Sequence, residues 1–395
     1  MRLPRMTMRR LLVVMLLVVG GIVWTLGRRP AAVSVPMREP RDYLGESNTM
    51  TAVAFAPGGR TLASGGSDGK VRLWDLDGRR ERSTLDLGKA VGVWPIAFRP
   101  GGEALIVGGN LRGGMVGGHV PGALSPPLQV WDPVSGVRRA GLHLGLQDHL
   151  RAMRVSADGR TLAIGGALPS TSGGTLVNVA DWRERVILWD TATWTERSSF
   201  TLGPGQVAAT AFDADLGTFA AASLDGTITL YDAATGRPSR TLKAGGAVMS
   251  LAISPDGRTL AVHLHGPSET IQFWDLETGL RRDSRPWPPS RKRSVLAFAP
   301  DGRTLAMTWS EIPGPYERLP MAFTRTLGIP PRRCEVVLWD IVSGRPRARL
   351  MAPATDILAD VAFSPDGRTV VAVGRPGPII LWDVPSDGSS AERSP

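Results

Sequence analysis

The chain has 395 residues, of which 42% are hydrophobic and 21% are charged. This balance supplies a buried core and excludes a globally disordered chain. A single cysteine, Cys334, excludes an internal disulfide framework, and the sequence has no Cys/His cluster with zinc-ligand spacing. The net charge is +10, but six of the 46 basic residues lie within residues 1–29, which hold no acidic residue. The other 40 basic and 36 acidic side chains nearly balance, so charge predicts no nucleic-acid partner.

The amino-terminal region contains an uncharged apolar segment. Residues 11–27 read LLVVMLLVVGGIVWTLG, with an arginine pair on each side. As a helix the segment spans roughly 25 Å, which reaches the short end of a bilayer core and exceeds a usual signal-peptide core. We therefore predict a single transmembrane helix after a basic cytoplasmic tail, residues 1–10. More arginines precede the helix than follow it, which predicts an extracytoplasmic body. Cleavage of the segment, giving a secreted protein, is the alternative.

One pattern recurs seven times along the rest of the chain. Each copy has an apolar strand, a tight turn, a second strand opening near Thr-Leu-Ala, and a third strand ending in an aromatic residue and aspartate. The turns read AFAPGGRTLA (54–63), AFRPGGEAL (97–105), VSADGRTLA (155–163), AFDADLGTFA (211–220), ISPDGRTLA (253–261), AFAPDGRTLA (297–306) and AFSPDGRTVV (362–371). The third strands end in Trp74, Asp75; Trp131, Asp132; Trp189, Asp190; Tyr231, Asp232; Trp274, Asp275; Trp339, Asp340; and Trp382, Asp383.

These residues make the chain resemble the WD40 repeat family over about residues 41–384. The resemblance implies an all-β fold, a seven-bladed β-propeller in which each blade is a four-stranded antiparallel sheet. When three apparent insertions are set aside, the repeat period is about 40 residues, which matches the family. We expect a linker at 28–39, the propeller at 40–384 and a disordered tail at 385–395.

The spacing also predicts how the ring closes. The last copy ends at Trp382-Asp383, and the polar residues after it are too few to form an outer strand. Leu44-Gly45 precedes Pro57 by the same interval that separates Leu87-Gly88 from Pro100, and that position follows an outer strand. We predict that residues of about 40–44 form the outer strand of the seventh blade, which removes two open sheet edges.

The chain departs from the eukaryotic type of the family and resembles the bacterial type. The Gly-His that usually begins each repeat is absent; Gly45-Glu46 and Gly88-Lys89 stand in its place. A buried Asp-His-Ser/Thr-Trp network is therefore not expected. We predict that Asp68 and Asp225, at the family's hairpin-aspartate position, act as turn residues.

Candidate binding residues lie in the irregular parts of the chain. Insertions at 110–128, 167–185 and 310–335 each fall between the second and third strands of a blade, which places them on one face. We interpret 281–293 as a basic crossover into blade six that combines with the insertion of that blade. The candidate partner-binding residues are Arg281, Arg282, Arg285, Trp287, Arg291, Lys292, Arg293, Tyr316, Arg318, Arg332 and Arg333. Solvated loops without a partner are the alternative.

Signals for catalysis are weak. His263 and His265 lie on one face of a strand at a spacing that can bind metal, but the sequence offers no third ligand. They are weak candidates, and we predict no metal site and no cofactor. The repeated aspartates are expected to be turn residues, and no P-loop motif is present.

The sequence thus favours a membrane-tethered, non-catalytic scaffold that binds an unspecified protein. An exported propeller enzyme, or a small-molecule or metal binder that uses the inserted loops, is a second hypothesis. Binding of a polyanion or of anionic lipid through the basic residues of blade six is a third.

Overall fold

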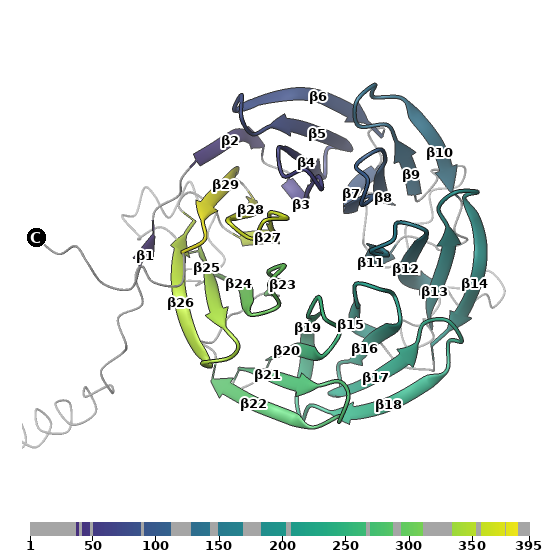
Figure 1. Cartoon of the computed structure of the whole chain (residues 1–395), viewed down its shortest axis with the longest axis vertical. Helices are drawn as coiled ribbons and strands as arrows, with labels where there is room; N and C mark the ends of the chain where they lie inside the picture. Colours follow the sequence, from purple (N-terminus) through teal and green to yellow (C-terminus); the bar gives the residue numbers. More distant parts are fainter. Residues whose placement is uncertain are drawn as a thin grey trace, which may run out of the picture. The chain divides into compact units, whose positions relative to one another are not determined.

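The computed structural model describes residues 37–38, 42–47, 50–87, 91–111, 128–142, 149–168, 183–202, 207–265, 269–286, 294–310, 334–352, 357–375 and 377–385. Every regular element among these residues is a β-strand. The strands form seven sheets that follow one another around a ring, as Figure 1 shows. The predicted all-β, seven-bladed propeller is confirmed.

Each blade is built from the centre outward in chain order, except that blade seven takes its outer strand from the amino-terminal side (Figure 1). Blade one comprises β3 (Met50–Phe55), β4 (Thr61–Gly66), β5 (Lys70–Asp75) and β6 (Arg80–Asp86); blade two β7 (Val91–Phe98), β8 (Leu105–Leu111), β9 (Leu128–Trp131) and β10 (Arg138–Leu142); blade three β11 (His149–Val155), β12 (Thr161–Leu168), β13 (Arg183–Asp190) and β14 (Thr195–Thr201); blade four β15 (Val207–Phe212), β16 (Thr218–Ser223), β17 (Thr227–Asp232) and β18 (Pro238–Lys243). Blade five comprises β19 (Ala247–Ile253), β20 (Thr259–His265), β21 (Thr270–Asp275) and β22 (Arg281–Pro286); blade six β23 (Leu296–Phe298), β24 (Thr304–Ser310), β25 (Cys334–Asp340) and β26 (Arg345–Met351); blade seven β27 (Ile357–Phe363), β28 (Thr369–Arg375), β29 (Gly377–Asp383) and β2 (Asp42–Ser47).

The Ser-x-Asp-Gly-Arg-Thr pattern closes the turn between the first and second strands. In blade seven the Ser364 hydroxyl donates to Asp366 Oδ1 over 2.5 Å and accepts the backbone N–H of Thr369 at 2.9 Å. Gly367 then takes a φ of 70°, in the left-handed region that favours glycine. Blades three and five repeat the same two bonds from Ser156 and Ser254. The recurrent motif is therefore a local device for turning the chain.

The aspartate after each third-strand aromatic closes the turn into the outer strand. Asp132 Oδ1 accepts the backbone N–H groups of Val134 and Ser135 at 2.8 and 3.0 Å. The equivalent aspartates that accept backbone N–H groups in their own turns are Asp75, Asp190, Asp232, Asp275 and Asp340. Asp68 and Asp225 likewise accept N–H groups two residues on, from Lys70 and Thr227. Their predicted role as turn residues is confirmed.

The core lies between the blades, because each sheet packs its two faces on its neighbours. One apolar cluster joins blades five and six through β20, β21, β24 and β25, and another joins blades six and seven. The third-strand aromatics fill these junctions: Trp382 is 1% exposed, and Trp74 donates its indole N–H to the Ser64 hydroxyl at 2.9 Å. Tyr231 replaces tryptophan in blade four and packs near the rings of Phe200 and Phe219.

The ring closes with an amino-terminal strand, as the spacing predicts. β2 pairs antiparallel with β29, and the register sets Asp42 opposite Leu381 and Ser47 opposite Gly377. The observed strand begins and ends slightly later than the predicted segment of 40–44. Blade seven therefore joins the two ends of the propeller and removes the open edges of an unclosed ring.

A second amino-terminal strand was not predicted. β1 (Met37–Arg38) pairs in parallel with the outer strand of blade six, with Met37 opposite Arg349 and Arg38 opposite Leu350. The residues before the closing strand thus add a fifth strand to blade six. Two adjacent blades receive strands from the same short stretch of chain.

The three insertions leave the ring between second and third strands, as predicted. They connect β8 to β9, β12 to β13 and β24 to β25, and most of their residues lie outside the described part of the chain. Residues 11–27, the predicted transmembrane segment, also lie outside it. Among described residues, no helix has the length and apolar character that crossing a bilayer requires.

Candidate functional sites

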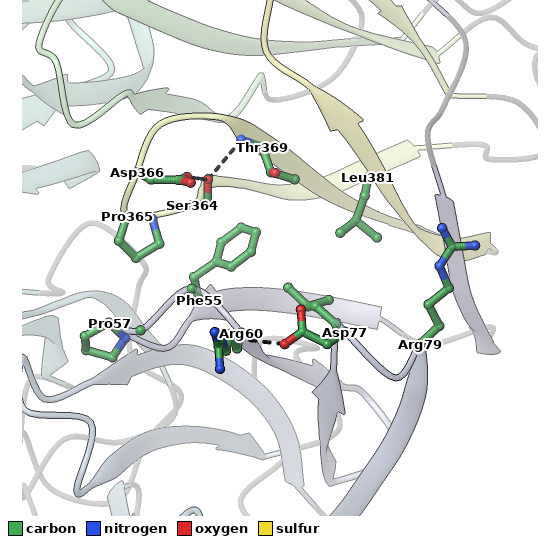
Figure 2. Close-up of a pocket in the computed structure, with 13 residues that line it drawn as sticks. Phe55, Pro57, Arg60, Asp77, Arg79, Ser364, Pro365, Asp366, Thr369 and Leu381 are labelled. Carbon is green, nitrogen blue, oxygen red and sulfur yellow. Dashed lines mark hydrogen bonds and ion pairs between the residues drawn. The ribbon is translucent and has the colours of Figure 1, made fainter.

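The structure contains a cavity of about 310 Å³ where blade seven meets blade one (Figure 2). It opens at the base of the ring, which we define as the face that carries the first-to-second and third-to-fourth strand turns. Its apolar lining comes from Phe55, Leu76 and Leu381. Polar and turn residues complete the lining: Pro57, Gly58, Gly59, Arg60, Asp77, Arg79, Ser364, Pro365, Asp366 and Thr369. The sequence pattern does not predict this site, because its two walls are far apart in the chain.

Two departures from the repeat pattern occur at this cavity. Gly58 stands where blades three, five, six and seven have aspartate, and a Cβ there would meet nothing within 4 Å. Arg79 has a φ of 50°, whereas the equivalent residues of four other blades are glycines in the left-handed region. An arginine in this conformation carries a backbone strain of about 1 kcal/mol.

The ion pair of Arg60 with Asp77, at 3.6 Å, is exposed and weak. The charged lining residues are two arginines, Arg60 and Arg79, and two aspartates, Asp77 and Asp366, so the charges of the lining balance.

The two candidate histidines lie beside a carboxylate that the sequence pattern does not predict. Glu269 lies just before β21, opposite the end of β20. Its Oε1 is 3.0 Å from His265 Nδ1, and its Oε2 is 3.6 Å from His263 Nε2. The side chains of His263 and Glu269 are 1% and 2% exposed, whereas that of His265 is 51% exposed. The hairpin register, which places Glu269 beside His265, is the signal that could have found it.

These three groups do not form a metal centre in the structure. Within the described ranges, no group of three or more His, Cys, Asp or Glu side chains is arranged to hold a metal ion. The Glu269 carboxylate hydrogen-bonds one imidazole and lies beyond hydrogen-bond distance of the other. The arrangement fixes the orientation of His265 and leaves His263 as a buried imidazole.

The predicted basic crossover needs a correction. Residues 281–286 form β22, the outer strand of blade five, and are not a loop that enters blade six. Arg282 pairs with Asp275, Arg285 Nε lies 2.7 Å from Asp283, and Arg281 lies over the Trp274 ring. An outer strand is largely exposed, so its charged, proline-containing sequence resembles a loop. Trp287, Arg291, Lys292, Arg293, Tyr316, Arg318, Arg332 and Arg333 lie outside the described residues.

Comparison with protein families adds one finding. The family model for the WD domain, G-beta repeat (WD40), matches residues 39–75. This segment contains β2, β3, β4 and β5, so one matched repeat supplies the outer strand of blade seven and three strands of blade one. The stagger explains why the ring closes through its amino-terminal strand. The match and the seven blades together support a WD40-like β-propeller.

Proposed function

We propose that the propeller is a non-catalytic protein-interaction scaffold, tethered to a membrane by residues 11–27 and located on the extracytoplasmic side. The observation that carries the proposal is the common direction of the three insertions. Because the blades are antiparallel meanders of the same polarity, strand ends Leu111, Leu168 and Ser310 all lie on one face, opposite the base. Long loops on a rigid ring are the usual way in which such scaffolds present a binding surface.

The scaffold gives these loops fixed roots. β8, β12 and β24 are second strands, and each places a leucine between blades: Leu105, Leu162 and Leu305 are each 0% exposed. Two of the insertions belong to the neighbouring blades two and three, and the third belongs to blade six. A partner protein that spans the face opposite the base can therefore contact loops from separate blades at once, which raises specificity without a catalytic group.

The test is a cross-linking pull-down of the full chain from native membranes. One variant carries Arg291, Lys292 and Arg293 changed to glutamate, and another replaces residues 311–333 by a short turn. Arg82→Glu with Arg138→Glu, both on exposed outer strands, is the matched control. We expect a specific protein that is lost from the two loop variants and kept by the control. Identical partners in all four samples, or no specific protein, would refute the proposal; salt-sensitive binding to anionic vesicles alone would favour lipid recognition.

A further inference from the structure

Blade five carries an ionisable side chain at a position where the other blades carry small or apolar ones. His263 is the fifth residue of β20, the second strand of blade five. The residues at the same position in the other blades are Gly65, Gly108, Gly165, Ala222, Thr308 and Val373. Gly65 and Gly108 are packed so tightly that an added Cβ would lie within 3 Å of the next blade. The position is thus a point of close approach between blades.

The His263 side chain points toward blade six. Leu260 and Val262 of the same strand belong to the apolar cluster of blades four and five, and Ala261 belongs to that of blades five and six. Strand alternation therefore directs His263 to the second junction. The residue is 1% exposed, and neither ring nitrogen has a hydrogen-bond partner among the described residues.

Among the described residues, few charged groups lie near the His263 imidazole. The carboxylate of Glu269 lies 3.6 Å away, and that carboxylate also binds the exposed His265. The packed strands β19, β23 and β24 read AVMSLAI, LAF and TLAMTWS and contain no ionisable side chain. β21 has Asp275 at its distant end, and β25 has Glu335, which pairs with Arg349. Within the part of the chain that the structure describes, Glu269 and His265 are therefore the titratable groups that influence His263.

We propose that His263 makes the junction between blades five and six sensitive to acid: the neutral imidazole packs in the junction, and its protonation loosens the contact. An imidazolium is costly in this buried site, because the nearest counter-charge, Glu269, lies 3.6 Å away and is shared with His265. Burial lowers the pKa of His263, while the Glu269 carboxylate opposes that shift and His265 adds to it. The stabilising contribution is therefore complete above the ordinary histidine pKa of about 6.5. It is lost as pH falls through the lower pKa of the folded protein.

The junction adjoins one of the insertion roots. β24 packs in the same junction and ends at Ser310, where the insertion of blade six begins. Loosening the junction therefore changes the support of that loop. This consequence rests on the proposed scaffold function, whereas the acid sensitivity of the junction does not.

Hydrogen exchange measured by mass spectrometry on the full chain tests whether the junction between blades five and six is sensitive to acid. Exchange of β20 and β24 is compared at pH ~7.5 and pH ~5, on either side of the ordinary histidine pKa, after correction for intrinsic rates. We expect acid to reduce protection of both strands in the wild type, and His263→Gln to abolish most of that loss. His263→Thr, which takes the residue of blade six, is the second variant in case glutamine is poorly accommodated. His265→Gln removes the neighbouring titratable group and shows whether the response comes from that residue instead; this variant should keep most of the acid response.

Partner binding is not part of this readout, so its outcome is separate from that of the scaffold proposal. An acid response unchanged in both His263 variants would overturn the proposal. So would an acid response that disappears only in His265→Gln. Stabilisation of the wild type by added Zn²⁺, lost in the His263 variants, would instead identify a metal site and also overturn it.

Discussion

Asp360 and Val53 bond across the closing seam of the ring, although 307 residues separate them in the chain. Asp360 Oδ2, on the inner strand of blade seven, accepts the backbone N–H of Val53, on the inner strand of blade one, at 3.0 Å. Burial raises the pKa of Asp360 to about 7, while the N–H groups of Val53 and Val361 act to lower it. The seam of the propeller therefore contains a carboxyl group that titrates near neutrality.

Replacement of Asp360 by asparagine should reduce the pH dependence of stability. An acid whose pKa is raised in the folded state destabilises the fold progressively as pH rises from about 4 to about 7. Between pH ~5 and pH ~8, the free energy of unfolding of Asp360→Asn should rise by roughly 1–3 kcal/mol relative to that of the wild type, at about 1.4 kcal/mol per pKa unit. Urea unfolding at both pH values measures the difference. The exposed Glu277→Gln is the control, and equal curves for wild type and Asp360→Asn would contradict the prediction.

The glycines at the point of close blade approach should differ in their tolerance of a methyl group. At Gly65 an added Cβ would lie 2.3 Å from Val93 Cγ1, whereas at Gly165 the nearest atom is 3.9 Å away. We expect Gly65→Ala to lower the free energy of unfolding by about 1–3 kcal/mol through overpacking. Gly165→Ala, at the same repeat position, should be neutral or stabilising by up to about 1 kcal/mol. Chemical denaturation checks both, and similar losses in the two variants would show that packing is not the cause.

Removal of the closing strand β2 should lower the unfolding temperature much more than removal of the residues after 385. A chain that begins at residue 48 lacks β1 and β2, so blade seven loses its outer strand and blade six its fifth. We expect a lower unfolding temperature and increased proteolysis near β29, whose edge becomes unpaired. A chain that ends at residue 385 keeps every strand described here and is the matched control. If both truncated chains melt together with the full chain, closure by β2 does not stabilise the ring.

The turn aspartates should contribute more to thermal stability through their backbone hydrogen bonds than through their ion pairs. Backbone N–H donation from Thr278 and the contact with Arg282 lower the pKa of Asp275 to about 2. The stabilisation from Asp275 is thus present above its ordinary pKa of about 4 and disappears as pH falls toward that of the folded protein. We expect Asp275→Ala to lower the melting temperature at neutral pH, and Arg282→Ala to change it little, because the Arg282 side chain is 53% exposed. If calorimetry shows a larger loss of melting temperature for Arg282→Ala than for Asp275→Ala, the ion pair contributes more than the turn hydrogen bonds and the prediction is wrong.

The sequence predicted what the repeat specifies locally. Alternating apolar residues and turn motifs give seven blades, and the regular interval before Pro57 gives the closing strand. Contacts between distant segments have no such pattern. The Asp360 bond to Val53, the cavity between two blades and the pairing of β1 depend on which blades adjoin and on how their ends meet. β22 was interpreted as a loop because an outer strand lacks the apolar face on which strand recognition depends.

The origin of the outer strand of blade seven sets an order of events during synthesis. β2 leaves the ribosome before any complete blade, yet its partner β29 is made last, and Ser47 meets Gly377 only then. At usual elongation rates of about 5–20 residues per second, β2 waits roughly 20–60 s for that strand. Throughout this interval β2 lacks its partner strand, so blade seven cannot be completed. Any chain released before its final strands therefore carries two exposed edges by which proteases and chaperones can distinguish it from the finished protein.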